Sequence, residues 1–228
     1  IINSPSNPTG AVMDEATLRA IGRLARERNL IVVSDEIYDQ LVYPPGRHWS
    51  IAQVMPELLE QTVIVGGVSK TYSMTGWRIG FAVGPQPWID AMITLQSHST
   101  SNPTSISQYA ALAALTGDQR PVAAMREAFQ KRRDRLVQGL NRLSPLRCAL
   151  PGGAFYAWCD VRDLGQPAAA TAAQWLEDAL VATVPGEGFG SSEFVRLSFA
   201  TSEATIDEGL ERLGKWLSRR RSANSLTR

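Results

Sequence analysis

The sequence predicts an α/β fold with a largely parallel sheet in its first half and a smaller α+β domain in its second half. Three observations support this prediction. A one-sided helical pattern leads directly into a short apolar run, further β-branched runs follow without polar alternation, and a Pro-Gly-Gly break then introduces alternating strands and helices. Apolar runs without alternation are typical of strands that are covered on both faces, as parallel strands usually are.

The first half of the chain reads as one helix followed by three buried strands. Residues 14–29 carry apolar side chains on one helical face, and Asp14 is placed to cap the N-terminus of this helix. Because each following run is short, apolar and β-branched, we expect all three strands to be covered on both faces. The predicted strands cover residues 30–33, 62–65 and 79–83.

Helical spacing of the apolar residues returns from Trp88 onward. The longest helix is predicted over residues 121–143, with its apolar side facing inward. Three arginines on the other side, Arg132, Arg133 and Arg135, are expected to be largely solvated. A solvated helix face explains this group of arginines more simply than a binding patch does.

A second pattern begins after the Pro-Gly-Gly break. We expect strands at residues 154–161 and 194–199 and helices at residues 171–182 and 205–217. The predicted domain organisation has four parts: residues 1–120 in the C-terminal part of a large domain, 121–143 as an interdomain helix, 144–218 as a small domain, and 219–228 as an irregular polar tail.

Composition excludes several classes of function. The 228 residues carry a formal net charge of +1, so no global field recruits nucleic acid, a membrane surface or a polyanionic substrate. The two cysteines and two histidines are too few and too scattered for a metal cluster. No apolar run is long enough to span a bilayer, and no signal peptide opens the chain. We therefore expect a cytoplasmic protein without a metal, nucleic-acid or membrane partner.

Lys70 lies in the most informative segment, residues 67–80, between two predicted strands. It is one of three lysines beside twenty arginines, and it follows a strand end flanked by small and hydroxyl residues. A partly desolvated lysine keeps more of its amine neutral, and a neutral amine can attack an aldehyde to form a Schiff base. A phosphate-binding P-loop is excluded, because that motif has Gly before the lysine and this chain has Ser69. The alternative is that Lys70 is a lysine at a strand end with no functional role.

Two further polar segments follow predicted strand ends. Asp35 lies just past a buried strand, where ligands of open α/β sheets collect, and Asn7 lies in a turn-forming loop after the first residues. Each also has a structural explanation, since Asp35 can cap the following turn and the loop can be only a turn.

These segments together resemble the class I aminotransferases of the fold-type I pyridoxal-phosphate enzymes. The resemblance rests on Ser-Asn-Pro-Thr-Gly at 6–10, Ser-Asp-Glu-Ile-Tyr at 34–38 and Ser-Lys-Thr-Tyr-Ser-Met-Thr-Gly-Trp-Arg-Ile-Gly at 69–80. Weaker matches are Gly-Ala-Phe-Tyr at 153–156 and Phe-Val-Arg-Leu-Ser-Phe at 194–199. The motifs span nearly the whole chain and look most like bacterial aspartate aminotransferases, although related aromatic and alanine enzymes share much of this pattern.

The resemblance implies a cofactor, pyridoxal 5′-phosphate, and a role for each matching residue. Lys70 would form the internal aldimine and move the α-proton between aldimine and ketimine, and Asp35 would keep the pyridine nitrogen protonated. The remaining implied roles are ring-oxygen binding by Asn7 and Tyr38, phosphate binding by Ser69 and Arg78, and substrate binding by Asn7 and Arg196. The implied reaction is amino transfer between an amino acid, aspartate or a similar one, and a 2-oxo acid such as 2-oxoglutarate.

The resemblance also bears on the extent and assembly of the chain. Residues 96–103 look like the family segment near the neighbouring subunit, which implies a homodimer, and His98 within them is not expected to be catalytic. The chain begins without Met, and the N-terminal arm and further strands that precede the first motif in the family are absent from it. We therefore expect an incomplete large domain with exposed sheet edges and weak cofactor binding on its own.

Two alternative functions stay open at this point. A β-eliminating lyase on the same fold uses the same carbanion, so Lys70 and Asp35 do not distinguish it from an aminotransferase. A transcription regulator could use such a domain to sense pyridoxal phosphate, and a basic helix-turn-helix module upstream of the chain would favour it.

Overall fold

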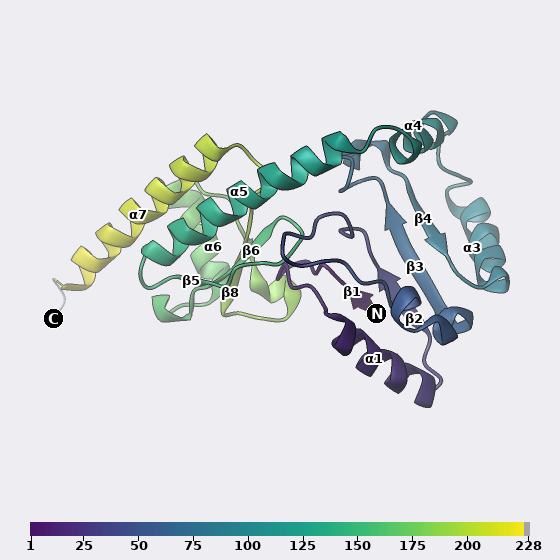
Figure 1. The fold of residues 1–228 in the computed structure, drawn as a ribbon. Helices are drawn as coiled ribbons and strands as arrows, with labels where there is room; N and C mark the ends of the chain where they lie inside the picture. Colours follow the sequence, from purple (N-terminus) through teal and green to yellow (C-terminus); the bar gives the residue numbers. More distant parts are fainter. Residues whose placement is uncertain (226–228) are drawn as a thin grey trace. The chain divides into compact units, whose positions relative to one another are not determined.

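A computed structural model describes residues 1–225, with side chains up to Arg220, and it contains two compact units (Figure 1). Unit 1 comprises residues 1–6 and 11–126, and unit 2 comprises residues 7–10 and the chain from residue 127 onward. The boundary after residue 126 falls inside a helix. The first division assigns four residues near the start of the chain to the unit formed by its second half, which the sequence did not predict.

Unit 1 is built on a four-stranded sheet in the order β1-β2-β3-β4. The first three strands pair in parallel, and the fourth is antiparallel to the third. The predicted α/β fold with a mainly parallel sheet is thereby confirmed. The strands are β1 (Ile2–Asn3), β2 (Val32–Asp35), β3 (Thr62–Gly67) and β4 (Gly80–Val83).

The helices of unit 1 begin with α1, which has the predicted N-cap. The backbone N–H of Thr17 donates to Asp14 Oδ1 at 2.8 Å. α1 packs against α2, a 3₁₀ turn η1 and the first two strands. The buried core there consists of Ile2, Leu18, Ala25, Val32, Ile51, Val54, Met55 and Leu58. The helical elements are α1 (Glu15–Glu27), α2 (Ile51–Val54), η1 (Pro56–Gln61), η2 (Thr75–Trp77), α3 (Gln86–Ser99), α4 (Ser105–Thr116) and the start of α5 (Arg120–Arg142).

Two of the predicted strands differ from the observed ones. Leu30 and Ile31 are 48% and 64% exposed and precede β2. Leu30 N donates to the carbonyl of Ala25, so this stretch closes α1 instead of entering the sheet. β4 was expected to be covered on both faces, yet Phe81 and Val83 are 47% and 59% exposed. That expectation is wrong: all four residues of β4 are exposed, and the strand lies at the end of this sheet, paired with β3.

Unit 2 contains an antiparallel sheet in the order β5-β6-β8-β7. α6 packs on β7 and β8 and against α7, where Trp175 meets Trp216 edge-on with ring centroids 6.3 Å apart. No helix of the described residues is long and apolar enough to cross a membrane. The elements are β5 (Arg147–Cys148), β6 (Tyr156–Asp160), η3 (Arg162–Leu164), α6 (Ala168–Ala179), β7 (Val184–Pro185), η4 (Gly186–Phe189), β8 (Phe194–Ser198) and α7 (Glu203–Ser225).

Two predictions for the second half are corrected by unit 2. Arg133 is only 5% exposed: it pairs with Asp134, and its Nη1 donates to the carbonyl of Pro151 at 3.0 Å, so it is a structural residue and not a solvated one. α7 continues to Ser225, so the tail expected from Arg219 is helical as far as that residue. Residues 226–228 lie outside the described part of the chain.

Gly10 joins residues 7–10 to the second half of the chain within unit 2. Its φ is +67°, and its carbonyl accepts a hydrogen bond from Gly153 N at 2.9 Å. A Cβ at this position would lie 2.4 Å from Cβ of Pro151. Only glycine therefore fits here, both for its backbone conformation and for the space available.

We predict that Gly10→Ala destabilises the protein much more than Gly165→Ala does. Gly165 has a similar φ of +71°, but a Cβ added there would have no heavy atom within 4 Å. Gly165→Ala should therefore cost only the left-handed backbone strain of about 1–2 kcal/mol, and Gly10→Ala a further ~1–3 kcal/mol for the clash. Urea denaturation measures both free energies of unfolding, and equal losses would contradict the crowding at Gly10.

Candidate functional site

Three parallel strands bring polar residues to one edge of the sheet in unit 1. β1 ends at Asn3 and β2 at Asp35, and these two residues are directly opposite each other in the parallel register. Asp35 is in turn opposite Val65, shortly before the end of β3. Ligands of open α/β sheets bind outside the carboxyl ends of the strands, so this edge is the candidate site.

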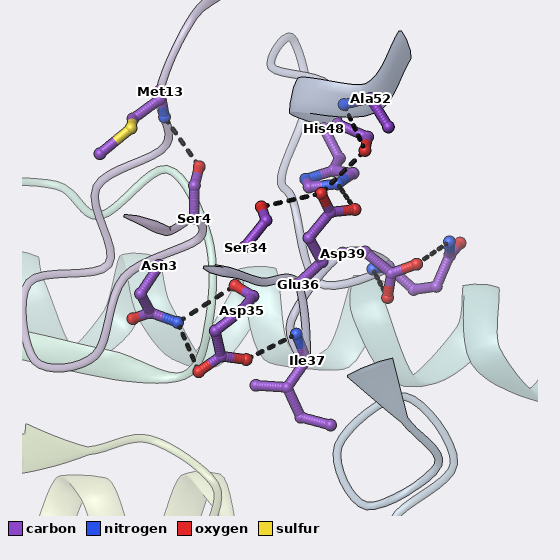
Figure 2. A network of polar contacts seen from close by, with 12 residues as sticks. Asn3, Ser4, Met13, Ser34, Asp35, Glu36, Ile37, Asp39, His48 and Ala52 are labelled. Atoms are coloured by element: carbon purple, nitrogen blue, oxygen red, sulfur yellow. Dashed lines mark hydrogen bonds and ion pairs between the residues drawn. The ribbon is translucent and has the colours of Figure 1, made fainter. Parts of the chain in front are cut away.

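The carboxylate of Asp35 is held by two hydrogen bonds (Figure 2). Asn3 Nδ2 donates to Oδ2 at 3.1 Å, and the backbone N–H of Ile37 donates to Oδ1 at 3.2 Å. An ionised carboxylate offers about four lone-pair sites, so it can accept a further proton donor in this fixed orientation. Sequence reasoning had not assigned Asn3 a role at the site, and the strand register was the signal that could have found it.

Glu36 anchors the segment between Asp35 and Tyr38. Its Oε1 accepts hydrogen bonds from Ser34 Oγ at 3.0 Å and Ser50 Oγ at 2.8 Å, and its Oε2 lies 3.1 Å from His48 Nε2 (Figure 2). Burial alone would raise the pKa of Glu36, but the hydrogen bonds from His48 and Ser50 and the charge of His48 outweigh it and lower the pKa. This network, which the motif did not reveal, fixes the backbone that carries the two neighbouring site residues.

Lys70 lies in a tight turn that follows β3. Tyr72 N donates to the carbonyl of Val68 at 3.2 Å, and Ser73 N donates to the carbonyl of Lys70 at 3.3 Å. Lys70 is half-buried. The turn therefore places Lys70 just past the end of β3, the strand that pairs with the one ending at Asp35.

The turn that carries Lys70 contacts the turn that follows Asp35. Thr71 Oγ1 donates to Asp39 Oδ1 at 3.4 Å. A Cβ on Gly67 would lie 3.1 Å from Cδ1 of Ile37, so the two segments also pack closely beside their strand ends. Thr71 and Asp39 were not recognised from the sequence, because a weak contact between two turns has no motif of its own.

The other predicted residues of unit 1 differ in exposure. Tyr38 is buried, Ser69 is half-buried and Arg78 is exposed. Arg78 has a left-handed backbone with φ 52°, and its Nη1 donates to the carbonyl of Thr75 at 2.9 Å. A guanidinium has five N–H donors, so Arg78 can bind an anion as well as its own turn.

Unit 2 contains the remaining two predicted residues. Arg196 lies in β8, and its Nη1 donates to Asn7 Oδ1 at 2.6 Å although the two residues are 189 positions apart in the sequence. The predicted site residues thus fall into two groups. Asp35, Tyr38, Ser69, Lys70 and Arg78 belong to unit 1, and Asn7 and Arg196 belong to unit 2.

The two groups offer distinct chemistry. Unit 1 provides a primary amine, a fixed carboxylate, a buried phenol, a hydroxyl and an exposed guanidinium, which suit covalent binding of an anionic carbonyl compound. Unit 2 provides a guanidinium and an amide, which suit a carboxylate. Within the described residues, no three His, Cys, Asp or Glu side chains are grouped to hold a metal ion.

We predict that Glu36→Gln lowers the free energy of unfolding at neutral pH. The wild-type protein should lose the same contribution when the pH falls. Because the folded-state pKa of Glu36 is lowered from 4.5, its contribution is present above that value and disappears as the pH falls through the folded-state pKa. At pH 7 the substitution should cost roughly 1.5–3 kcal/mol, and the two proteins should converge in acid. Denaturant titrations at several pH values measure this.

The matched control for this experiment is Glu57→Gln. Glu57 is 45% exposed and pairs with Arg26 only at 3.7 Å, so its substitution should change the free energy of unfolding little at any pH. If the free energies of unfolding of the wild type and of Glu36→Gln changed in parallel across the acid range, the anchoring role of Glu36 would be contradicted.

Comparisons with known proteins show which family this chain resembles. A family model described as "Aminotransferase class I and II" matches residues 1–213. The aspartate aminotransferase of Geobacillus stearothermophilus is 48% identical over 225 residues, and the aspartate/prephenate aminotransferase of Thermus thermophilus is 45% identical over 222. The crystal structure of an aromatic aminotransferase from Pyrococcus horikoshii is similar with a TM-score of 0.93 and 38% identity.

The matches cover most of this chain but only part of each relative. They include 96% of this chain in all three cases, and 57% of the Geobacillus protein, 56% of the Thermus protein and 60% of the Pyrococcus chain. The chain therefore spans little more than half the length of these relatives.

Proposed function

The chain belongs to the aminotransferase class I and II family, and from this premise we propose that the protein transfers an amino group between an amino acid and a 2-oxo acid. The observation that carries the proposal is that Lys70 and Asp35 lie at neighbouring strand ends, where the turn that carries Lys70 contacts the turn that follows Asp35. As substrates we propose aspartate or a similar amino acid and 2-oxoglutarate or a similar 2-oxo acid. The names of the Geobacillus and Thermus relatives support aspartate.

The residues of unit 1 fit pyridoxal 5′-phosphate, the cofactor of this family. Asp35 can accept a hydrogen bond beyond the two that fix it, Lys70 supplies the amine, and Arg78 has N–H donors for a phosphate. When bound, this cofactor supplies an aldehyde carbon for attachment of an amine and a pyridine ring that accepts electrons from the substrate Cα.

Lys70 and Asp35 perform the proton chemistry in this proposal. Lys70 Nζ would hold the aldehyde carbon of the cofactor, and as a free amine it would accept the proton from the substrate Cα. The carboxylate of Asp35 would keep the pyridine nitrogen protonated, because an anion fixed beside that nitrogen stabilises the protonated form. Asn3 and Glu36 support this task by fixing the side chain and the backbone of the Asp35 segment.

The other residues bind and orient. Tyr38 and Asn7 would donate hydrogen bonds to the ring oxygen, and Ser69 and Arg78 would hold the phosphate. Arg196, whose position beside Asn7 suits the binding of a carboxylate, would bind the α-carboxylate of the substrate together with Asn7.

We also propose that the protein acts as a homodimer. The proposal rests on the resemblance of residues 96–103 to the segment that approaches the neighbouring subunit in this family. These residues lie at the end of α3 and in the loop that follows it, and all but Pro103 are exposed in the single chain.

The first test of the function follows the nitrogen atom. The full-length protein loaded with pyridoxal phosphate should transfer ¹⁵N from labelled aspartate to 2-oxoglutarate, and Lys70→Arg should lose at least ~10³-fold of this rate because a guanidinium cannot act as the nucleophile. Mass spectrometry of the glutamate produced measures the transfer.

Borohydride treatment of the same loaded protein should attach the cofactor to the peptide that contains Lys70. Attachment at Lys131 or Lys215 would overturn the assignment of the lysine. Release of ammonia and pyruvate from β-substituted amino acids without nitrogen transfer would instead indicate a β-lyase.

The second test concerns the carboxylate. We predict that Asp35→Ala slows removal of the α-proton by at least ~10²-fold, because one preorganised charge is lost from the site. Stopped-flow measurements with α-deuterated aspartate follow this step, and Asp90→Ala on the exposed α3 serves as control. An unchanged rate with cofactor still bound would show that Asp35 does not serve the ring.

A further inference from the structure

We propose that Phe189 and Tyr156 position Arg196 by holding its guanidinium against two aromatic rings, and that Phe189 thereby sets how tightly the substrate carboxylate binds. This inference deepens the proposed function and rests on it. It assigns to Phe189, a residue outside every motif discussed above, the role of a positioning residue.

The geometry around Arg196 carries the proposal. Its Cζ lies 4.5 Å from the ring centroid of Tyr156 and 5.0 Å from that of Phe189. Both distances are within the range of a cation–π interaction. The third neighbour is Asn7, which accepts from Nη1 at 2.6 Å. Two rings and one amide therefore fix the orientation of a group that still has N–H donors for a ligand.

Fixing the guanidinium matters because carboxylate recognition is directional. A carboxylate forms its two parallel bonds with a guanidinium only when the two groups are coplanar. An arginine side chain has many rotamers, and restricting them at each binding event costs affinity. Rings that already hold the group remove much of that cost before the substrate arrives.

The ring of Phe189 is itself held in place by its turn. Phe189 ends the 3₁₀ turn η4, and Gly190 follows it with φ +83°. Gly186 at the start of the turn is so crowded that a Cβ would lie 2.4 Å from the carbonyl oxygen of Ser191. Ser191 N also donates to the carbonyl of Gly186 at 3.0 Å. This hydrogen bond closes the turn, which carries Phe189 beside Arg196 of β8.

Trp158, which lies in β6, packs against the ring of Phe189. It lies directly opposite Arg196 in the β6–β8 register, and its ring meets Phe189 edge-on at 5.8 Å. The other aromatic contact of Trp158 is a parallel stack with Phe194 at 5.3 Å. Phe194 belongs to the same aromatic group but has no ring contact with Arg196, which makes it a matched control.

Phe189 is the better of the two rings to test. Tyr156 is 7% exposed and packs against Phe155 in the core, so its removal would leave a cavity. Phe189 is 38% exposed, and a leucine there should keep unit 2 folded while removing the ring.

The experiment compares Phe189→Leu, Phe189→Tyr and Phe194→Leu in the full-length protein loaded with cofactor. We expect Phe189→Leu to raise KM for 2-oxoglutarate and Kd for the unreactive dicarboxylate succinate by roughly 2- to 30-fold, the range that a cation–π contact supports. The value of kcat should change by less than about 2-fold, because the reacting groups lie elsewhere. Phe189→Tyr should restore the wild-type values, and Phe194→Leu should leave them unchanged.

A second measurement tests the positioning of Arg196 without measuring enzyme activity. In the protein without cofactor, the side-chain ¹⁵N–¹H signal of Arg196 should shift in Phe189→Leu because a ring current is lost, and it should return in Phe189→Tyr. Thermal unfolding of each variant establishes that the fold is kept.

The outcomes separate this inference from the function on which it rests. Unchanged KM, Kd and arginine signal in Phe189→Leu would overturn the positioning role, and so would an equal rise in Phe194→Leu, which would indicate general loosening. If the wild-type protein transferred no nitrogen while the Arg196 signal still depended on Phe189, the proposed function would be wrong and the positioning role of Phe189 would still hold.

Discussion

The parallel register of β1, β2 and β3 is the constraint on which the candidate site in unit 1 depends. It sets Asn3 opposite Asp35 and brings the end of β2 beside that of β3. A slip by one residue would turn Asp35 to the other face of the sheet, because successive strand residues point in opposite directions. The same slip would shift the turn that follows Asp35 relative to the turn that carries Lys70. The apolar packing of α1 against β1 and β2 therefore stabilises the register as well as the fold.

A second constraint acts in unit 2, where the loop of Asn7 is built into a fold formed mainly by the second half of the chain. Gly10 allows this because its positive φ and its lack of a side chain let the loop lie against Pro151 and Gly153. Arg133 supports the same place from α5 through the carbonyl of Pro151. The proposed roles therefore divide between the units, with cofactor attachment assigned mainly to unit 1 and carboxylate binding to unit 2.

The sequence predicted the parts of this protein that local patterns encode. Helix α1 with its Asp14 cap follows from local rules, and the family motifs identified Lys70, Asp35 and Arg196 as candidates. It could not predict that Leu30 and Ile31 are exposed, because a short apolar run looks the same whether it closes a helix or opens a strand. Arg133 was misjudged because its partner, a backbone carbonyl 18 residues away, leaves no trace in side-chain spacing. The proposed roles of Asn3, Glu36 and Phe189 rest on contacts that only the folded chain creates.

The use of cations in this chain follows the chemistry of each group. Arginine serves where a permanent, planar charge is needed: Arg133 lies buried beside a carbonyl and Arg196 lies against two rings. A guanidinium keeps its proton in such places and has a flat face for an aromatic ring, whereas an ammonium is more strongly hydrated and can lose its charge when buried. The capacity to become neutral is what an amine needs to bind an aldehyde. Among twenty arginines and three lysines, the chain has a half-buried lysine just past the end of β3, where the proposed attachment of an aldehyde would use an amine.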